Sequence, residues 1–458
     1  MKSIFRKTTE TSIMLLFLLS FVFTSCNSQK QNTNDTWAEI NDTLKSRWDN
    51  YIGQHELLPK PYTKALGAQK EFYYWDVYFI NKGLLVHERF DLIKNNIDNL
   101  TFEIDSFGYV PNALVSWGIS RSQPPFYSMM VRDYYEAVSS VDKGWLLKCY
   151  NAALQEYAFW NNASTKVNGN NATTIEGLSR YGYMADTASL ASVYKGISHR
   201  FPELPEMTEN EKIKFGADII AECGTGMDFT WRYQQRCTDF VSVDLNSNLY
   251  VYEKNFSWFE NILGLSPSQN WDSLAQIRKE RINKYCWDEE RGLFTDYDFV
   301  NTRLNPVASM AMFWPLYFGV ATQEQAARSV NALDFMQSEW GIRATELVEA
   351  PYKLQWDGNA VWAPVQLMAY GALKKYGFDI QANKVAETYL NLVSKNWQNP
   401  YPKSFEHDGE TLQRKPCYIW EKYSVDGNIN DADYPSNEMM GWSAGVFVYF
   451  FNELNSEK

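Results

Sequence analysis

The sequence predicts one large all-α domain. Apolar residues recur at three- and four-residue spacing, the periodicity of a helix with one buried face. One such series is Phe90, Ile93, Ile97 and Leu100. Few stretches alternate with the period of two that a half-buried strand shows. Beyond the N-terminal segment, no linker rich in Pro, Gly or Ser divides the chain and no short repeat is present. We therefore expect a single domain over 37–458.

The composition is that of a globular protein with an unusual number of aromatic residues. The chain has 458 residues, of which 45% are hydrophobic and 21% charged, which excludes disordered and fibrous classes. The net charge of −12 leaves no basic excess for nucleic acid, so nucleic-acid binding is not expected. Aromatic residues make up 16% of the chain. Their rings stack on sugars, although a large helical core also uses them.

The N-terminal segment has the pattern of a bacterial lipoprotein signal. Three basic residues precede an apolar run over 13–23, which is too short for a membrane-spanning helix and fits a secretory signal. Small residues then precede Cys26, as in a lipobox. We expect 1–25 to be removed, Cys26 to be lipidated and 26–36 to be a polar tether. The alternative is ordinary signal cleavage that releases a free protein.

These features predict an exported protein in a bacterium, periplasmic or anchored to the outer membrane. No second apolar stretch approaches membrane length, so the lipid would be the only contact with the membrane. We expect a monomer whose partner is a small carbohydrate.

Helices are expected, in chain order, at 90–100, 145–154, 248–263, 271–286, 306–317, 323–335, 361–376 and 380–397. Loops between them carry chemically specific residues at 107–112, 121–125 and 426–435. Such loops on a rigid scaffold are where function tends to be located.

Metal or thiol chemistry is not expected. After removal of the signal, the scattered cysteines are Cys149, Cys223, Cys237, Cys286 and Cys417. Their odd number argues against a disulfide framework. No CxxC occurs, and the four histidines lie far apart, so zinc and copper clusters lack ligands at usable spacing. We therefore expect no metal and no cofactor, and catalysis would depend on carboxylates.

Tryptophans are followed by acids more often than chance predicts. Six of the 17 tryptophans have such a neighbour, where composition alone gives about two. These acids are Asp49, Asp76, Asp272, Asp288, Asp357 and Glu421. A ring beside a carboxylate suits a sugar site, because the ring stacks and the carboxylate binds hydroxyls or transfers a proton. Asp76, Asp357 and Glu421 have the densest aromatic surroundings, whereas the other three fit helix caps.

A further candidate acid, Asp228, lies in a glycine-containing segment. Gly224 and Gly226 permit close backbone approach to a ligand, and Arg232 follows one turn later. An ordinary acid at a helix N-terminus is the alternative.

These segments together resemble the α,α-trehalase family of glycoside hydrolases. The run from Tyr73 to Phe79 is similar to the first signature of that family, and the run from Gln355 to Pro364 is similar to the second. Further family motifs occur in the same order between them, at 110–112, 121–125, 157–160, 243–246 and 287–292.

The resemblance implies an (α/α)6 toroid, two concentric rings of six helices with the site in a central funnel. The 422 residues of 37–458 allow about 35 residues for each helix and its loop. The family inverts the anomeric configuration, so Asp228 is implied as the general acid and Glu421 as the general base. An inverting pair requires a separation of roughly 6.5 to 9.5 Å. The residues implied to line the glucose subsites are Trp75, Asp76, Asn112, Arg121, Ser122, Gln123, Gly226 and Trp356, with Asp433 in place of a family glutamate.

Two departures from the family concern substrate binding. Ala68 stands where the family has an arginine, and 186–189 stands where it has an arginine and a glutamate. The resemblance makes α,α-trehalose the leading substrate. The two departures make another substrate, cleaved by an exo-acting α-glucosidase or α-mannosidase, the alternative. A glycan-binding lipoprotein is a second alternative, but it would need no acid–base pair.

The loop that follows Glu421 has two interpretations. Over 426–433 its oxygen-bearing residues alternate as in a calcium loop, but it lacks the glycine at the sixth position and the closing glutamate. A polar flap over the funnel is the favoured interpretation.

Overall fold

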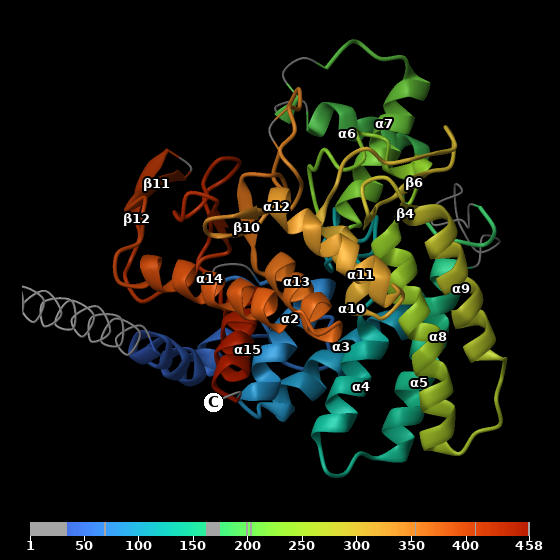
Figure 1. Ribbon diagram of the computed structural model, residues 1–458, viewed down its shortest axis with the longest axis horizontal. Coiled ribbons are helices and arrows are strands. Elements are labelled where there is room, and N and C mark those ends of the chain that lie inside the picture. Colours follow the sequence, from blue (N-terminus) through green and yellow to red (C-terminus); the bar gives the residue numbers. More distant parts are fainter. Residues whose placement is uncertain are drawn as a thin grey trace, which may run out of the picture.

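The computed structural model describes residues 34–67, 70–161, 175–197, 200–201, 204–352, 354–407 and 409–456. Most of these residues are helical (Figure 1). The helices are α2 (Tyr74–Val86), α3 (Phe90–Phe107), α4 (Tyr127–Ala137), α5 (Lys143–Asn161), α6 (Thr187–Gly196), α7 (Glu209–Cys223), α8 (Val243–Leu263), α9 (Trp271–Cys286), α10 (Trp314–Tyr317), α11 (Gln323–Ser329), α12 (Leu333–Met336), α13 (Ala363–Lys375), α14 (Asp379–Trp397) and α15 (Trp442–Ser456). The predicted signal, Cys26 and Ala68 lie outside the described residues.

The strands are short and connect loops rather than form a layer. They are β1 (Ile52–Gly53), β2 (Tyr62–Thr63), β3 (Phe240–Val241), β4 (Trp287–Asp288), β5 (Leu293–Phe294), β6 (Tyr297–Asp298), β7 (Arg303–Leu304), β8 (Gln337–Ser338), β9 (Gly341–Ile342), β10 (Ala360–Trp362), β11 (Ser404–His407), β12 (Glu410–Gln413) and β13 (Lys422–Ser424). The pairing of β10 with β13 places Trp362 opposite Lys422, so it joins the second signature to the segment of Glu421.

Helices that follow one another in the chain pack as neighbours, as α8 does with α9 and α13 with α14 (Figure 1). The last helix, α15, packs against α2. Their backbones meet at two glycines, because a Cβ atom at Gly83 would lie 2.7 Å from the Cα of Gly445. A larger residue would separate the two helices. Helix α15 is thus fixed beside the first signature.

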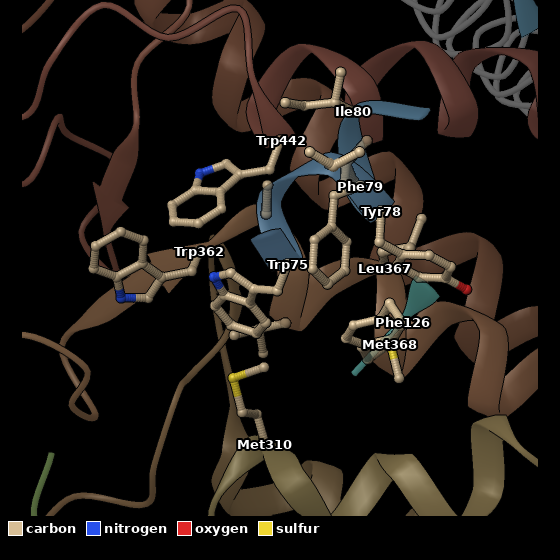
Figure 2. Close-up of a cluster of buried hydrophobic side chains, with 14 of the residues drawn as sticks. Trp75, Tyr78, Phe79, Ile80, Phe126, Met310, Trp362, Leu367, Met368 and Trp442 are labelled. Atoms are coloured by element: carbon tan, nitrogen blue, oxygen red, sulfur yellow. The ribbon is translucent and has the colours of Figure 1, made fainter. Parts of the chain in front are cut away.

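The core beneath the site is aromatic (Figure 2). Trp75 contacts Phe79 edge-on, with ring centroids 5.5 Å apart, and Trp442 from α15 at 6.0 Å. Trp356 stacks on Trp362 at 4.1 Å. All of these rings are buried. They fix one another and form a rigid floor.

The predicted helices are largely confirmed, and the errors have identifiable causes. α3, α5, α8, α9 and α14 lie where periodicity placed them. The stretch 306–317 forms only a 3-10 turn, Met310–Phe313, and the short α10. Pro315 stands in the first turn of α10, where proline is tolerated because it lacks an N–H.

Two other predicted helices are shorter than expected. The residues 323–335 divide into α11, a 3-10 turn and α12. The residues Val361 and Trp362 form β10 rather than helix, because α13 begins at Ala363 with Pro364 in its first turn. Across the described ranges no helix is long and apolar enough to cross a lipid bilayer.

Candidate active site

A cavity of about 800 Å³ opens above the aromatic floor, a size that suits a small ligand. The beginning of α2, the loop after α7, the second signature and the segments around Glu421 contribute its walls. The sequence-predicted residues that line it are Trp75, Asp76, Asn112, Gln123, Gly226, Asp228, Trp356 and Glu421. Arg121, Ser122 and Asp433 are buried or partly buried and are not among the lining residues.

Asp228 is held in the loop that follows α7. Gly226 has a φ of 76°, and a Cβ there would lie 2.5 Å from the ring of Trp75; glycine is therefore required. The Thr230 amide donates to Glu222 Oε1 at 3.1 Å. Burial raises the pKa of Asp228 to about 6, against the opposing effect of Arg121 and Arg200. Asp228 can thus carry a proton in mildly acidic conditions.

Glu421 has hydrogen-bond donors around its carboxylate. The Tyr434 hydroxyl donates to Oε1 at 2.8 Å, and Asn437 Nδ2 donates to Oε2 at 3.3 Å. Burial raises the pKa of Glu421, while Lys422 and these hydrogen bonds lower it. The indole of Trp442 donates to the Glu421 carbonyl at 3.0 Å. The side chain is therefore fixed, and these donors offset part of the effect of burial on its pKa, which stays raised.

Asp76 is influenced by both of these acids. It lies in the first turn of α2, where the helix dipole favours an acid. Burial raises the pKa of Asp76 well above its usual value, and the charges of Glu421 and Asp228 add to that rise. Gln123 accepts a hydrogen bond from the Trp75 amide at 3.1 Å, so it orders the start of the same helix.

The candidate acid Asp357 does not line the cavity. It accepts a hydrogen bond from the Asn359 amide at 2.9 Å.

The structure adds an arginine that sequence reasoning missed. Arg200 donates to Asp433 at 2.6 Å, and its guanidinium lies 3.9 Å from the centroid of the Phe229 ring. The segment 186–189, where the family has charged residues, instead begins α6, since Asp186 accepts the Ser189 amide at 2.7 Å. The departure at 186–189 stays an expectation, and Arg200 is a cation that follows α6 and pairs with Asp433.

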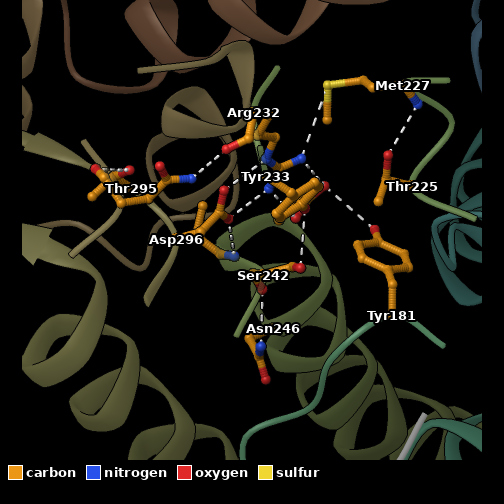
Figure 3. A network of polar contacts seen from close by, with 12 residues as sticks. Tyr181, Thr225, Met227, Arg232, Tyr233, Ser242, Asn246, Thr295 and Asp296 are labelled. Carbon is orange, nitrogen blue, oxygen red and sulfur yellow. Dashed lines mark hydrogen bonds and ion pairs between the residues drawn. The ribbon is translucent and has the colours of Figure 1, made fainter. Parts of the chain in front are cut away.

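Arg232 does not line the cavity and belongs to a buried polar network (Figure 3). Its fully buried guanidinium forms ion pairs with Asp244 at 2.8 Å and Asp296 at 2.6 Å. Asp296 also accepts the Val243 amide at 3.0 Å. Arg232 therefore connects the loop of Asp228 to α8 and to the segment before β6.

The contacts of the loop 426–433 favour the flap interpretation. Arg414 binds both oxygens of Asp431, at 2.6 and 3.0 Å, and Asp433 is paired with Arg200. Arginines thus occupy two of the three carboxylates of this loop, and Asp426 accepts the Asn428 amide at 3.0 Å. Within the ranges that the structure describes, no group of three His, Cys, Asp or Glu is arranged to hold a metal. Tyr434 and Pro435 continue the flap into the cavity wall.

Comparisons with known proteins agree on one family. The model of the Trehalase family matches residues 16–455. The chain is 29% identical over 462 residues to the cytosolic neutral trehalase of Kluyveromyces lactis, covering 93% of this chain and 61% of that protein. It is 28% identical over 467 residues to the cytosolic neutral trehalase of Saccharomyces cerevisiae, with the same coverage. The chain thus spans about three fifths of the length of these relatives.

Solved structures share the fold. Neutral trehalase Nth1 from Saccharomyces cerevisiae superposes with a TM-score of 0.69 at 24% identity, covering 91% of this chain and 80% of that chain. The GH63 mannosylglycerate hydrolase from Thermus thermophilus gives 0.59 at 16% identity, covering 91% and 99%. The predicted all-α (α/α)6 toroid is confirmed by these likenesses. Since the family model covers nearly the whole chain, the protein belongs to the trehalase family.

Proposed function

We propose that the chain hydrolyses α,α-trehalose to two glucose molecules with inversion at the attacked carbon. The observation that carries this proposal is the pair of acids, Asp228 and Glu421, that line one aromatic cavity with different hydrogen-bond partners. Burial raises the pKa of both acids, that of Asp228 to about 6, and at Glu421 the hydrogen-bond donors offset part of the rise. One acid is suited to give a proton and the other to accept one.

The reaction needs one water and no further reactant. Asp228 protonates the glycosidic oxygen as its bond to the anomeric carbon breaks. Glu421 removes a proton from a water molecule whose oxygen forms the new bond on the opposite face. One glucose leaves in the β configuration and the other in the α configuration. In this proposal the buried rings of Trp75 and Trp356 stack on the sugar, and Asp76, Asn112 and Gln123 bind its hydroxyls.

Proton NMR of the purified protein with α,α-trehalose tests this proposal. Equal amounts of α- and β-glucose in the first minutes are expected, because inversion converts only one half of the disaccharide. Early release of α-glucose alone would contradict inversion. If folded protein does not cleave α,α-trehalose, another α-glycoside becomes the proposed substrate.

A related exo-acting α-glucosidase or α-mannosidase is the second candidate. Ala68 favours it, because an arginine of the family is absent at that position. A panel of α-linked disaccharides separates the two, since the preferred substrate gives the highest kcat/KM. Binding of sugars without turnover would instead indicate a glycan-binding lipoprotein.

Replacing Arg200 by Met is expected to move the alkaline limb of the pH–rate profile to higher pH. Arg200 lowers the pKa of Asp228, and Asp433 raises it; loss of the cation removes the first effect and strengthens the second. Because the acid must be protonated, activity would then be lost at a higher pH. Loss of charge-assisted contacts would also reduce kcat/KM about 10- to 100-fold.

The Arg200 prediction is checked by pH profiles of kcat/KM. Arg200→Lys should shift the limb less, since it keeps the charge. Arg303→Met is the matched control, because Arg303 is 58% exposed and outside the cavity lining. An unchanged limb in Arg200→Met would show that Arg200 does not act on Asp228.

We propose further that 1–25 is a lipoprotein signal, Cys26 the lipid attachment point, 26–36 a tether and 37–458 the catalytic domain of an exported bacterial monomer. The basic, apolar and small-residue pattern before Cys26 supports this arrangement, although the two relatives are named cytosolic. Membrane fractionation of Cys26→Ala tests it, with release from the membrane expected. Light scattering of the released protein tests the monomer.

A further inference from the structure

The cavity has an outer part that differs from its floor. Trp75 and Trp356 are each 1% exposed, whereas Trp117 lines the same cavity and is 49% exposed. A half-exposed tryptophan is costly to leave in water. The other walls of this cavity combine aromatic rings with carboxylates. An exposed ring among them is available to stack on a ligand.

Trp117 is held in place by its loop rather than by burial. The Asn112 amide donates to the Arg121 carbonyl at 2.9 Å and closes the loop. Arg121 in turn donates to the Trp117 carbonyl at 2.7 Å, and its guanidinium lies 5.3 Å from the ring centroid. A Cβ at Gly118 would lie 2.4 Å from the Ala113 carbonyl oxygen. The turn is therefore tight, and the ring is ordered before any ligand arrives.

A second exposed wall comes from the hairpin of β11 and β12, which projects from the helical body (Figure 1). Phe405 and Leu412 are directly opposite each other in this hairpin, and both line the cavity. Leu412 is 38% exposed. At the base of the hairpin, the Arg414 guanidinium lies 4.6 Å from the centroid of the Phe405 ring. The hairpin thus contributes apolar side chains to the same cavity as Asp228 and Glu421.

We infer that Trp117 and this face of the hairpin form an outer subsite for a further pyranose ring. Its occupant would be a sugar joined to the leaving half of a trehalose unit, which places the natural substrate among glucosylated trehaloses. This inference rests on the proposed trehalose hydrolysis. The cavity volume of about 800 Å³ is near the upper end of the roughly 300 to 1,000 Å³ of small-ligand sites, so room for a third ring is available.

The test compares α,α-trehalose with a trisaccharide that carries one more glucose, α-linked to O4 of one half. Cleavage of the trisaccharide at the trehalose bond releases glucose and maltose. In the unaltered protein we expect kcat/KM for the trisaccharide to equal or exceed that for trehalose. Trp117→Ala should lower the trisaccharide-to-trehalose ratio about five- to tenfold, because one ring stack is lost.

Two variants separate stacking from a general effect on the loop. Trp117→Phe should keep most of the ratio, since it keeps an aromatic face. Ile119→Ala is the matched control: Ile119 is 44% exposed in the same loop but does not line the cavity. An unchanged ratio in Trp117→Ala, or an equal fall in Ile119→Ala, would overturn the subsite.

Binding to Asp228→Asn protein separates failure of the subsite from failure of the proposed activity. Calorimetry should show tighter binding of the trisaccharide than of trehalose, and Trp117→Ala should remove the difference. If the unaltered protein cleaves neither sugar but this difference persists, the activity is wrong and the subsite stands. If the trisaccharide binds no tighter, the subsite is wrong whatever the activity.

Discussion

Asp228→Asn and Glu421→Gln should each reduce the rate of trehalose hydrolysis about 100- to 10,000-fold, the usual contribution of one general acid or base. Asparagine cannot give a proton to the leaving oxygen, and glutamine cannot take one from water. Both changes preserve shape, so the fold and the contacts of Tyr434 and Asn437 should persist. Steady-state kinetics together with circular dichroism check this result.

The two roles can be separated by the leaving group. Fluoride leaves α-glucosyl fluoride without protonation, so Asp228→Asn should retain more of its activity on that substrate than on trehalose. Glu421→Gln should lose activity on both, because each reaction still requires an activated water. Equal losses on both substrates in Asp228→Asn would contradict its role as acid.

Asp357→Asn is the matched control for this pair. Asp357 also follows a tryptophan, yet it binds the Asn359 amide and lies outside the cavity lining. Its change should leave the rate within a few fold. A loss as large as that of Glu421→Gln would mean that the sugar site has been placed at the wrong acid.

The second large effect concerns stability. Arg232→Met should lower the free energy of unfolding by about 3–5 kcal/mol, the cost of leaving buried charges without their partner. Asp244 and Asp296 would both lose their ion pair to this fully buried guanidinium. Urea unfolding followed by circular dichroism measures the change.

Arg303→Met again provides the control, because Arg303 is exposed and 3.7 Å from Asp298. An exposed ion pair is worth at most about 1 kcal/mol. If Arg232→Met were no more destabilising than this control, the buried network would not hold the loop of Asp228.

The helices could be predicted from sequence where one apolar face persists over many turns. α9 is expected at 271–286 and has these bounds, whereas 306–317 lacks such a face and carries prolines. Asp76 and Glu421 could be selected as candidates from the sequence, because aromatic neighbours mark each of them within a short segment.

The residues that could not be predicted act through contacts between distant segments. Arg200 reaches Asp433 across 233 positions of the chain, and no local pattern around it indicates this pairing. Trp117 is distinguished from the buried tryptophans by its exposure, which the sequence around it does not indicate. Burial and loop closure, which decide these roles, are properties of the folded chain.

The contact between α2 and α15 sets the order in which the protein can be completed during translation. Gly83 and Gly445 bring the two helices together, and Trp442, the first residue of α15, contacts both Trp75 and the Glu421 backbone. In the chain α15 follows every other segment of the cavity, so the floor cannot close while that helix is still in the exit tunnel of the ribosome. Nascent chains should therefore leave the cavity floor incomplete until α15 has emerged from the tunnel.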